Sequence, residues 1–141
     1  MADLKVMYSS TTDLWATPQH FFDELDAEFH FTLDPCALPS NAKCSKFFTP
    51  DDNGLSQDWG GETVFCNPPY GRAIGDWVFK CHYEAQKPNT TVVALLPART
   101  DTQYFHKYIY NKAREIRFIK GRLKFGDSKN SAPFPSMLVI F

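Results

Sequence analysis

Residues 63–70 read TVFCNPPY, a short apolar run followed at once by asparagine, two prolines and tyrosine. The β-branched and aromatic residues of this run are typical of a buried strand. The strand has to end at Asn67, because a proline has no N–H to continue a sheet ladder and its ring fixes φ. The pattern therefore predicts a rigid polar notch at the tip of a β-strand.

The predicted notch at 67–70 suits a planar amino group. The side-chain oxygen of Asn67 and the carbonyl of Pro68 can both accept hydrogen bonds from an –NH2 group. The ring of Tyr70 offers a face on which a flat substrate can stack. Such contacts draw the nitrogen lone pair out of conjugation and toward an electrophile. We therefore expect Asn67, Pro68, Pro69 and Tyr70 to be the catalytic residues.

Helices and strands are predicted to alternate on both sides of the notch. In the first helix we expect Thr17 to be the cap and Pro18 to occupy the first helical position. Hydrophobic periodicity and cap residues place helices over 17–29, 74–85 and 102–113, and strands over 31–33, 46–49, 63–66, 91–96, 115–119 and 137–141.

This alternation indicates an α/β sheet. The uninterrupted run TVVALL at 91–96 is typical of a central parallel strand buried on both faces. In such sheets the active groups gather at the carboxyl ends of the strands. Asp34, Asn67 and Pro97 all fall at predicted strand ends, so we expect them at one edge of the sheet.

The composition indicates a single domain over 1–141, because 141 residues with 43% hydrophobic content can bury one core but not two. The N-terminal residues do not resemble a signal peptide, and no apolar run approaches membrane-spanning length. The expected location is the cytoplasm. The four cysteines form no Cys-x-x-Cys pair and the four histidines share no ligand spacing, so we expect reduced structural thiols and no metal site.

The net charge of −1 hides an uneven distribution along the chain. The first forty residues hold seven acidic residues against one lysine, whereas residues 112–129 hold seven basic residues against two acidic ones. Such asymmetry is compatible with a polyanion at one end of the molecule, and also with a solvated basic face.

Seven blocks together resemble the phage-type DNA adenine methyltransferases, a Dam-like family of class I methyltransferases that use S-adenosylmethionine. The blocks occur in the order of that family and span nearly the full chain. They are WATP at 15–18, LDPCA at 33–37, GLSQDW at 54–59, NPPY at 67–70, LLPARTD at 95–101, GRLKF at 121–125 and PFPSML at 133–138.

The resemblance implies a Rossmann-like fold with a mostly parallel sheet, an antiparallel C-terminal strand and helices on both faces. It implies transfer of a methyl group from S-adenosylmethionine to the exocyclic amino group of a flipped adenine in DNA. The chain is then a minimal methyltransferase without a separate target-recognition domain, acting as a monomer or homodimer in the host cytoplasm. Protection of DNA from restriction enzymes is the biological role that a phage-type family suggests.

The resemblance also assigns residues to cofactor and DNA. Asp34 and Pro35 match the loop against the methionine part of the cofactor, and Asp58 matches the acidic position for its adenine amino group. The predicted cofactor-binding residues are Trp15, Thr17, Pro18, Asp34, Pro35, Asp58 and Asn67. Phe125 is a candidate second stacking partner for the flipped base. Apart from the resemblance, the predicted DNA-binding residues include Arg99, Arg122 and Lys124, which could be phosphate contacts or plain surface charges.

The chain departs from the wider class after its first predicted strand, where Asp34 to Ala37 stand in place of a Gly-x-Gly loop. Backbone amides must then approach the cofactor without the usual glycine allowance. For the acidic residue that binds the ribose, Asp51, Asp52 and Asn53 compete.

Two other functions fit the same residues. A protein glutamine or an RNA base also presents a planar amino group that could lie between Asn67 and Tyr70. A catalytically inactive nucleic-acid-binding or decoy protein would keep the fold and lose affinity for the cofactor. Sequence choice on DNA would come from loops over 36–45, 98–106 and 126–134, or from a second subunit.

Overall fold

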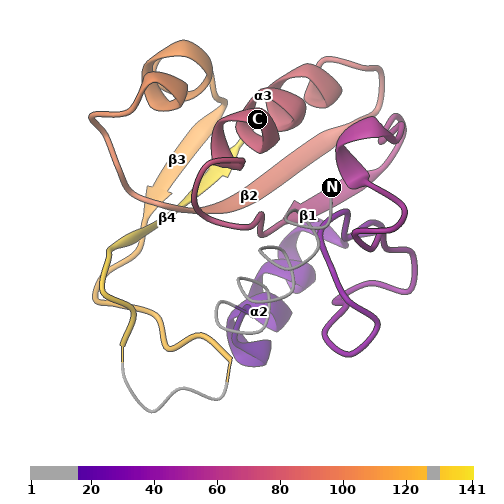
Figure 1. Ribbon diagram of the computed structural model, residues 1–141, viewed down its shortest axis with the longest axis horizontal. Coiled ribbons are helices and arrows are strands. Elements are labelled where there is room, and N and C mark those ends of the chain that lie inside the picture. The colour runs from indigo at the N-terminus through magenta and orange to yellow at the C-terminus, as the bar shows by residue number, and fades with distance from the viewer. Residues whose placement is uncertain (1–15, 127–130) are drawn as a thin grey trace.

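The computed structural model describes residues 16–126 and 131–141 of the chain, which form a mixed α/β fold. A four-stranded sheet has the order β1-β2-β4-β3 (Figure 1). Its strands are β1 (Thr63–Cys66), β2 (Thr91–Pro97), β3 (Glu115–Phe118) and β4 (Ser136–Ile140). Strand β4 runs antiparallel to both of its neighbours, and β1 pairs in parallel with β2. The predicted antiparallel C-terminal strand is therefore confirmed, and it inserts between β2 and β3.

Two of the predicted strands are reduced to single bridges. Leu33 pairs in parallel with Val64, and Asp34 pairs in parallel with Phe47. The segment before Pro35 thus runs beside β1, but it does not continue as a ladder because a proline has no N–H to donate. Asp34, Asn67 and Pro97 nevertheless lie at the same carboxyl edge of the sheet, as the sequence predicted.

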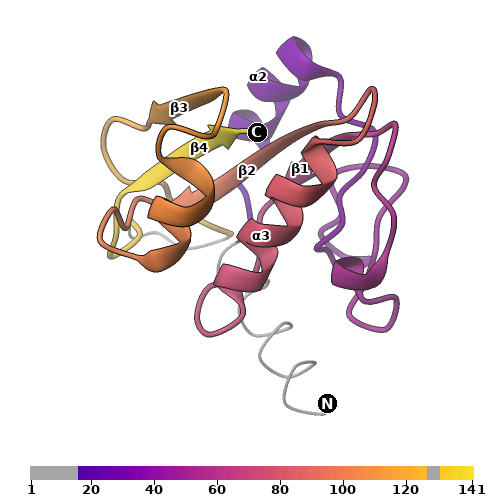
Figure 2. The same cartoon turned by 90° about the horizontal axis from the view of Figure 1, so that it is seen from above.

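Successive residues of β2 enter two different apolar clusters, as the alternation of side chains along a strand requires. Val92, Ala94 and Leu96 pack with side chains of helix α3 (Ile74–Ala85). Val93 and Leu95 pack with side chains of helix α2 (Gln19–Phe29). Figure 2 shows β2 and β4 running between these helices. The apolar run at 91–96 is therefore buried on both sides, as predicted.

The first predicted helix begins two residues late. Pro18 is the N-cap of α2 rather than its first helical residue, and no side chain caps the helix. Thr17 instead directs its hydroxyl to Asn67. The prediction of Thr17 as a cap is therefore wrong, because a tertiary contact takes its hydroxyl.

The predicted helix over 102–113 is also wrong in length and type. Only a short π-helical turn, η2 (Phe105–Ile109), forms there, and Tyr110 is already extended. Asn111 then adopts a left-handed conformation with φ 61°. This conformation ends a helix, and asparagine tolerates it better than most residues. Among the described residues, no helix has the length and apolar character needed to cross a membrane.

Candidate active site

The Asn67 amide is held at the carboxyl end of β1 by hydrogen bonds at both of its polar atoms. Its Nδ2 donates to the hydroxyl of Thr17 over 3.1 Å. Its Oδ1 accepts from the hydroxyl of Tyr70 over 3.2 Å, and the same hydroxyl lies 3.3 Å from the carbonyl oxygen of Leu95. Because these partners come from three separate parts of the chain, tertiary packing orients the amide.

Two phenylalanines hold the Tyr70 ring in place. The ring of Phe134 lies edge-on to it with a centroid distance of 5.4 Å, and that of Phe125 at 6.5 Å. Burial raises the pKa of Tyr70 well above its usual range, so the hydroxyl stays protonated and can donate to Asn67. The aromatic packing therefore supports the hydrogen bond that orients the amide.

Beside Tyr70 lies a cavity of about 630 Å³, which we call the base cavity. Its volume is within the range of about 300–1,000 Å³ typical of ligand sites. The guanidinium of Arg99 lies 5.9 Å from the centre of the Phe134 ring, at the wall of this cavity. The lining residues are Tyr70, Gly71, Ile74, Pro97, Arg99, Thr102, Tyr104, Pro133 and Phe134.

Asn67 itself lines a second, polar space, which we call the Asp34 cavity. Its narrow inner part, about 20 Å³, is bounded by Thr17, Asp34 and Asn67 among others. A wider neighbouring pocket of about 400 Å³ shares Thr17 and Lys43 with it and is also lined by Pro18, but not by Asp34 or Asn67. The loop 67–70 thus contributes Asn67 to one cavity and Tyr70 to the other.

The carboxylate of Asp34 is buried at this site. Within the described part of the chain, its hydrogen-bond donors are backbone amides. Its Oδ2 accepts from the Lys43 amide over 3.0 Å and its Oδ1 from the Cys36 amide over 3.3 Å. The ammonium of Lys43 donates elsewhere, to Gln19. Burial raises the pKa of Asp34 to about 6, although the two backbone donors act to lower it.

This shift predicts that Asp34 makes the unliganded protein less stable as the pH rises from about 4 to about 6. In that window the native state holds a proton that the unfolded state has released, so the free energy of unfolding falls with pH. The contribution amounts to about 3 kcal/mol, at about 1.4 kcal/mol per pK unit. We expect urea unfolding between pH 4 and 7 to show this slope, and Asp34→Asn to lack it. If the free energy of unfolding depended on pH in the same way in both proteins, the raised pKa of Asp34 would be refuted.

A glycine from another loop packs directly against the backbone that follows Asp34. A Cβ atom at Gly54 would lie 2.2 Å from the carbonyl oxygen of Pro35, so only glycine permits this approach. Gly54 begins the short 3-10 turn η1 (Gly54–Ser56). This contact fixes the loop after Asp34 against η1.

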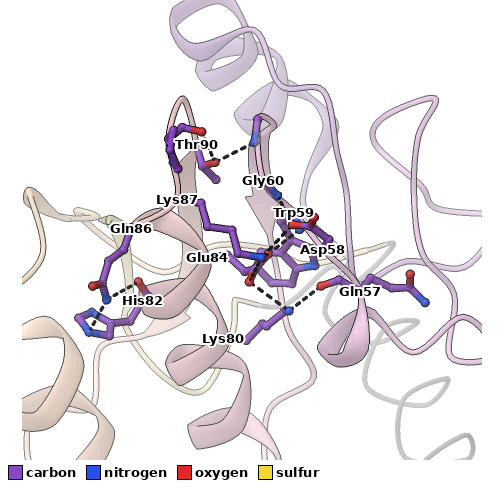
Figure 3. A network of polar contacts seen from close by, with 12 residues as sticks. Gln57, Asp58, Trp59, Gly60, Lys80, His82, Glu84, Gln86, Lys87 and Thr90 are labelled. Atoms are coloured by element: carbon purple, nitrogen blue, oxygen red, sulfur yellow. Dashed lines mark hydrogen bonds and ion pairs between the residues drawn. The ribbon is translucent and has the colours of Figure 1, made fainter.

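Asp58 lies apart from the other predicted cofactor residues. Its side chain is 78% exposed and pairs with Lys87 over 2.8 Å (Figure 3). Lys87 follows the C-terminal end of α3. The amide of Gly60 donates to Asp58, and that of Gly61 donates to Thr90 just before β2. Asp58 is therefore near the amino ends of β1 and β2, whereas Asn67 stands at the carboxyl end of β1. The structure gives Asp58 an ion-pair partner and no place in the Asp34 cavity.

The predicted DNA-binding residues divide into two kinds. Arg99, Arg122 and Lys124 are exposed, and all three follow the carboxyl ends of strands. Phe125 is only 1% exposed and does not line the base cavity. Phe134 lines it instead, so the structure puts Phe134 where the sequence led us to expect Phe125.

The basic segment over 112–129 does not form one face. Arg117 is bound by Glu28 and Glu115, and Arg114 directly precedes β3, at the edge opposite Asn67. Trp15, Asp127 and Lys129 lie outside the described residues. Fewer basic side chains therefore lie near Asn67 than the count of basic residues over 112–129 indicates.

Comparison with known proteins places the chain among enzymes. A family model described as DNA N-6-adenine-methyltransferase (Dam) matches residues 6–141. The chain belongs to this family. The resemblance found from the seven sequence blocks is thereby confirmed.

Three similar proteins illustrate how far the Dam-family similarity extends. A DNA N-6-adenine-methyltransferase of Haemophilus phage HP1 is 36% identical over 140 residues, which cover 94% of this chain and 80% of that relative. A protein of the same name from Escherichia phage T1 is 34% identical over 113 residues, covering 79% of this chain and 46% of the relative. The putative methyltransferase YfdM of Escherichia coli K12 is 37% identical over 65 residues, 41% of this chain.

Several residues of this Dam-family site escaped the sequence analysis. Phe134 and Tyr104 line the base cavity, and Lys43 lines the Asp34 cavity. A phenylalanine between two prolines just before a buried strand is a signal comparable to Asn-Pro-Pro, and it could have identified Phe134. Lys43 has no such signal, because it reaches the site through the fold of a loop.

The cysteines of this Dam-family chain are free thiols, and the one before Asn67 is buried. All four are described, and none is in a disulfide. Burial raises the pKa of the Cys66 thiol well above its usual range, so it stays protonated and is no nucleophile. Within residues 16–126 and 131–141, no group of three or more His, Cys, Asp or Glu side chains is arranged to hold a metal ion.

Proposed function

We propose that this chain transfers a methyl group from S-adenosylmethionine to the exocyclic amino group of adenine in DNA. One observation carries the proposal for this member of the Dam family. The loop 67–70 places Asn67 in a polar cavity and Tyr70 in an aromatic one, so one short segment can contact both donor and acceptor of the methyl group.

We further propose the class I, Rossmann-like arrangement for the whole domain. In support of this, β1, β2 and β3 point the same way, β4 runs against them, and the bridges at Leu33 and Phe47 continue the sheet beyond β1. The packing of α2 and α3 on alternate side chains of β2 supports helices on both faces.

The chemistry of the Asp34 cavity supports the proposal that the methionine end of S-adenosylmethionine binds beside it. A buried carboxylate whose resolved hydrogen bonds come from backbone amides suits the cationic amino group of that ligand. Thr17, Pro18, Pro35 and Asn67 would contact it around this carboxylate, and Trp15 remains a predicted contact. Asp58 lies outside this set and remains a predicted contact for the adenine amino group of the cofactor. When bound, the cofactor supplies an electrophilic methyl group on a sulfonium.

The chain's own residues position the target nitrogen. Adenine has to leave the duplex, at a cost of a few kcal/mol, before the site can reach it. The Oδ1 atom of Asn67 and the carbonyl of Pro68 then accept hydrogen bonds from the amino group, and Tyr70 supports the flipped base. Orientation alone can supply about 7–11 kcal/mol of the barrier, and no covalent enzyme intermediate is needed.

The reaction is tested by offering labelled S-adenosylmethionine with DNA, RNA or total protein to the purified chain. We expect label in DNA, recovered as N6-methyladenine by mass analysis of nucleosides. Label in RNA or protein alone would refute adenine methylation of DNA. An inactive protein would give neither label nor a thermal shift with the cofactor.

Thr17 is a positioning residue in this proposal, because it accepts from Asn67 Nδ2. We expect Thr17→Val to lower kcat by about 10- to 100-fold, since a small misplacement of a reacting group can cost that much. Thr17→Ser keeps the acceptor and should restore most of the rate, with melting temperature measured for both. Equal rates for valine and serine would exclude a role for the hydroxyl.

A further inference from the structure

A second large cavity lies next to the base cavity, outside the site described above. It has a volume of about 500 Å³ and opens between the first half of α3 and the segment 103–108. We call it the flanking cavity. It shares Ile74 and Tyr104 with the base cavity, so the two spaces have a common wall.

The lining of the flanking cavity combines cations with aromatic rings. Arg72 and Lys107 are exposed, and neither forms an ion pair with any other described residue. Phe79 is 47% exposed, and its ring lies 5.4 Å from that of Tyr108. Positive charge beside open aromatic faces is typical of surfaces that bind unpaired nucleotides.

Two further groups in the wall can contact base edges. The amide of Gln103 can both donate and accept hydrogen bonds, and the carboxylate of Asp76 can accept from a base amino group. The same carboxylate disfavours a bare anion between the two cations. A nucleotide, with amino groups as well as a phosphate, therefore suits this wall better than an inorganic phosphate does.

Tyr104 supplies an independent indication of a ligand at the common wall. Its residue is only 8% exposed, and its buried hydroxyl meets no partner at full hydrogen-bond geometry among the described residues. The hydroxyl of Thr102 is near enough to act on the pKa of Tyr104, where it opposes the stronger effect of burial. The neighbouring hydroxyl of Thr102 donates to the carbonyl of Arg99 instead. A buried polar atom without a partner costs free energy unless a ligand or water supplies one.

We propose that the nucleotide next to the target adenine, in the same DNA strand, binds in the flanking cavity. Its base lies against Phe79 and Tyr108 with its edge toward Gln103, and Arg72 and Lys107 contact the adjoining phosphates. Tyr104 donates a hydrogen bond at the step between the two nucleotides. This inference rests on the proposed function, and it identifies the part of the surface that selects sequence beside the adenine.

The phosphate contacts are tested by salt dependence of DNA binding. We expect the double variant Arg72→Ala/Lys107→Ala to lower the slope of log K against log salt by about 2, since each phosphate contact to a duplex contributes about 0.9. The matched control is Lys46→Ala/Arg114→Ala, which removes the same charge from the opposite edge of the sheet. Equal slopes in the two double variants would overturn the proposal.

The stacking contact is tested with oligonucleotides that carry an abasic site directly 5′ or 3′ of the methylated adenine. For the wild-type protein, we expect one of these abasic sites to weaken binding about 5- to 150-fold. Phe79→Ala should remove that difference. Tyr110→Ala changes a ring of similar exposure, 53% against 47%, that lies outside the cavity, and should keep the difference. The proposal is wrong if Phe79→Ala responds to the abasic site as the wild type does.

These results remain distinguishable from failure of the proposed function. Suppose that the wild-type chain methylates adenine in DNA, but Arg72→Ala/Lys107→Ala and Phe79→Ala give the same results as their control variants. The proposed reaction then stands, and the flanking cavity does not bind the nucleotide next to the target adenine. If the wild type transfers no methyl group to DNA, the function itself is refuted.

Discussion

Replacing Asn67 by alanine is expected to slow methyl transfer to adenine by about 10²–10³-fold, the range found when one group that stabilises a transition state is removed. The variant loses the oxygen that accepts from the target amino group. It also leaves the hydroxyls of Thr17 and Tyr70 without the amide that they now contact. Single-turnover measurement with saturating S-adenosylmethionine and DNA isolates this step from binding.

Asn67→Asp is the matched control for the alanine variant. An aspartate keeps an acceptor oxygen at the same place, and the Thr17 hydroxyl can donate to it rather than accept. We expect this variant to retain far more activity than Asn67→Ala, with similar melting temperatures for both. Turnover of the alanine variant at the wild-type rate would disprove the proposed site.

Replacing Glu84 by alanine is expected to lower the free energy of unfolding by about 3–5 kcal/mol, the usual cost of removing one partner from a buried charge cluster. Glu84 is fully buried in α3. Its carboxylate accepts from the amide of Trp59 over 2.5 Å, and pairs with Lys87 at 2.8 Å and Lys80 at 3.4 Å (Figure 3). The melting temperature should fall by about 10–20 °C.

Two variants separate the charge of Glu84 from its bulk. Glu84→Gln keeps an acceptor for the Trp59 amide and should cost less than alanine, whereas Glu24→Ala on the exposed part of α2 should change stability by about 0.5 kcal/mol or less. If Glu84→Ala melts within a degree of Glu24→Ala, the cluster does not stabilise the fold.

The cluster around Glu84 also predicts a pH dependence opposite in sign to that of Asp34. Burial acts to raise the pKa of Glu84, but hydrogen bonds from Lys87 and the Trp59 amide outweigh it, and the pKa is lowered. Its contribution is present above the unfolded pKa near 4.5 and is lost as the pH falls. Wild type should therefore lose stability in acid relative to Glu84→Gln.

The strands and helices with strong local signals could be predicted from sequence. The ranges 63–66 and 74–85 were predicted as the structure has them, because an apolar run before two prolines and a regular 3.6-residue periodicity are local properties. The helix predicted over 102–113 is wrong, although the apolar spacing there suits a helix. The chain forms one short π-helical turn, and the left-handed conformation of Asn111 ends it.

The candidate site shows the same division. The loop 67–70 and Asp34 could be predicted, because strand ends bring such residues to one edge. The ion pair of Asp58 could not be predicted, because its partner Lys87 lies 29 residues away in the sequence. The sequence predicted Phe125 as the aromatic partner and missed Phe134; both rings pack against Tyr70, but only Phe134 lines the cavity.

The sequence alone identified the family, through the order of its seven blocks. Local chemistry predicted the notch at 67–70 and the central buried strand, since proline geometry and hydrophobic periodicity act between near neighbours. Tertiary structure decided how the Asn67 amide is oriented, which carboxylates lie in cavities and which are ion-paired, and where the cations meet aromatic rings. These properties depend on side chains that are far apart in sequence and are brought into contact only when the sheet and its helices pack together.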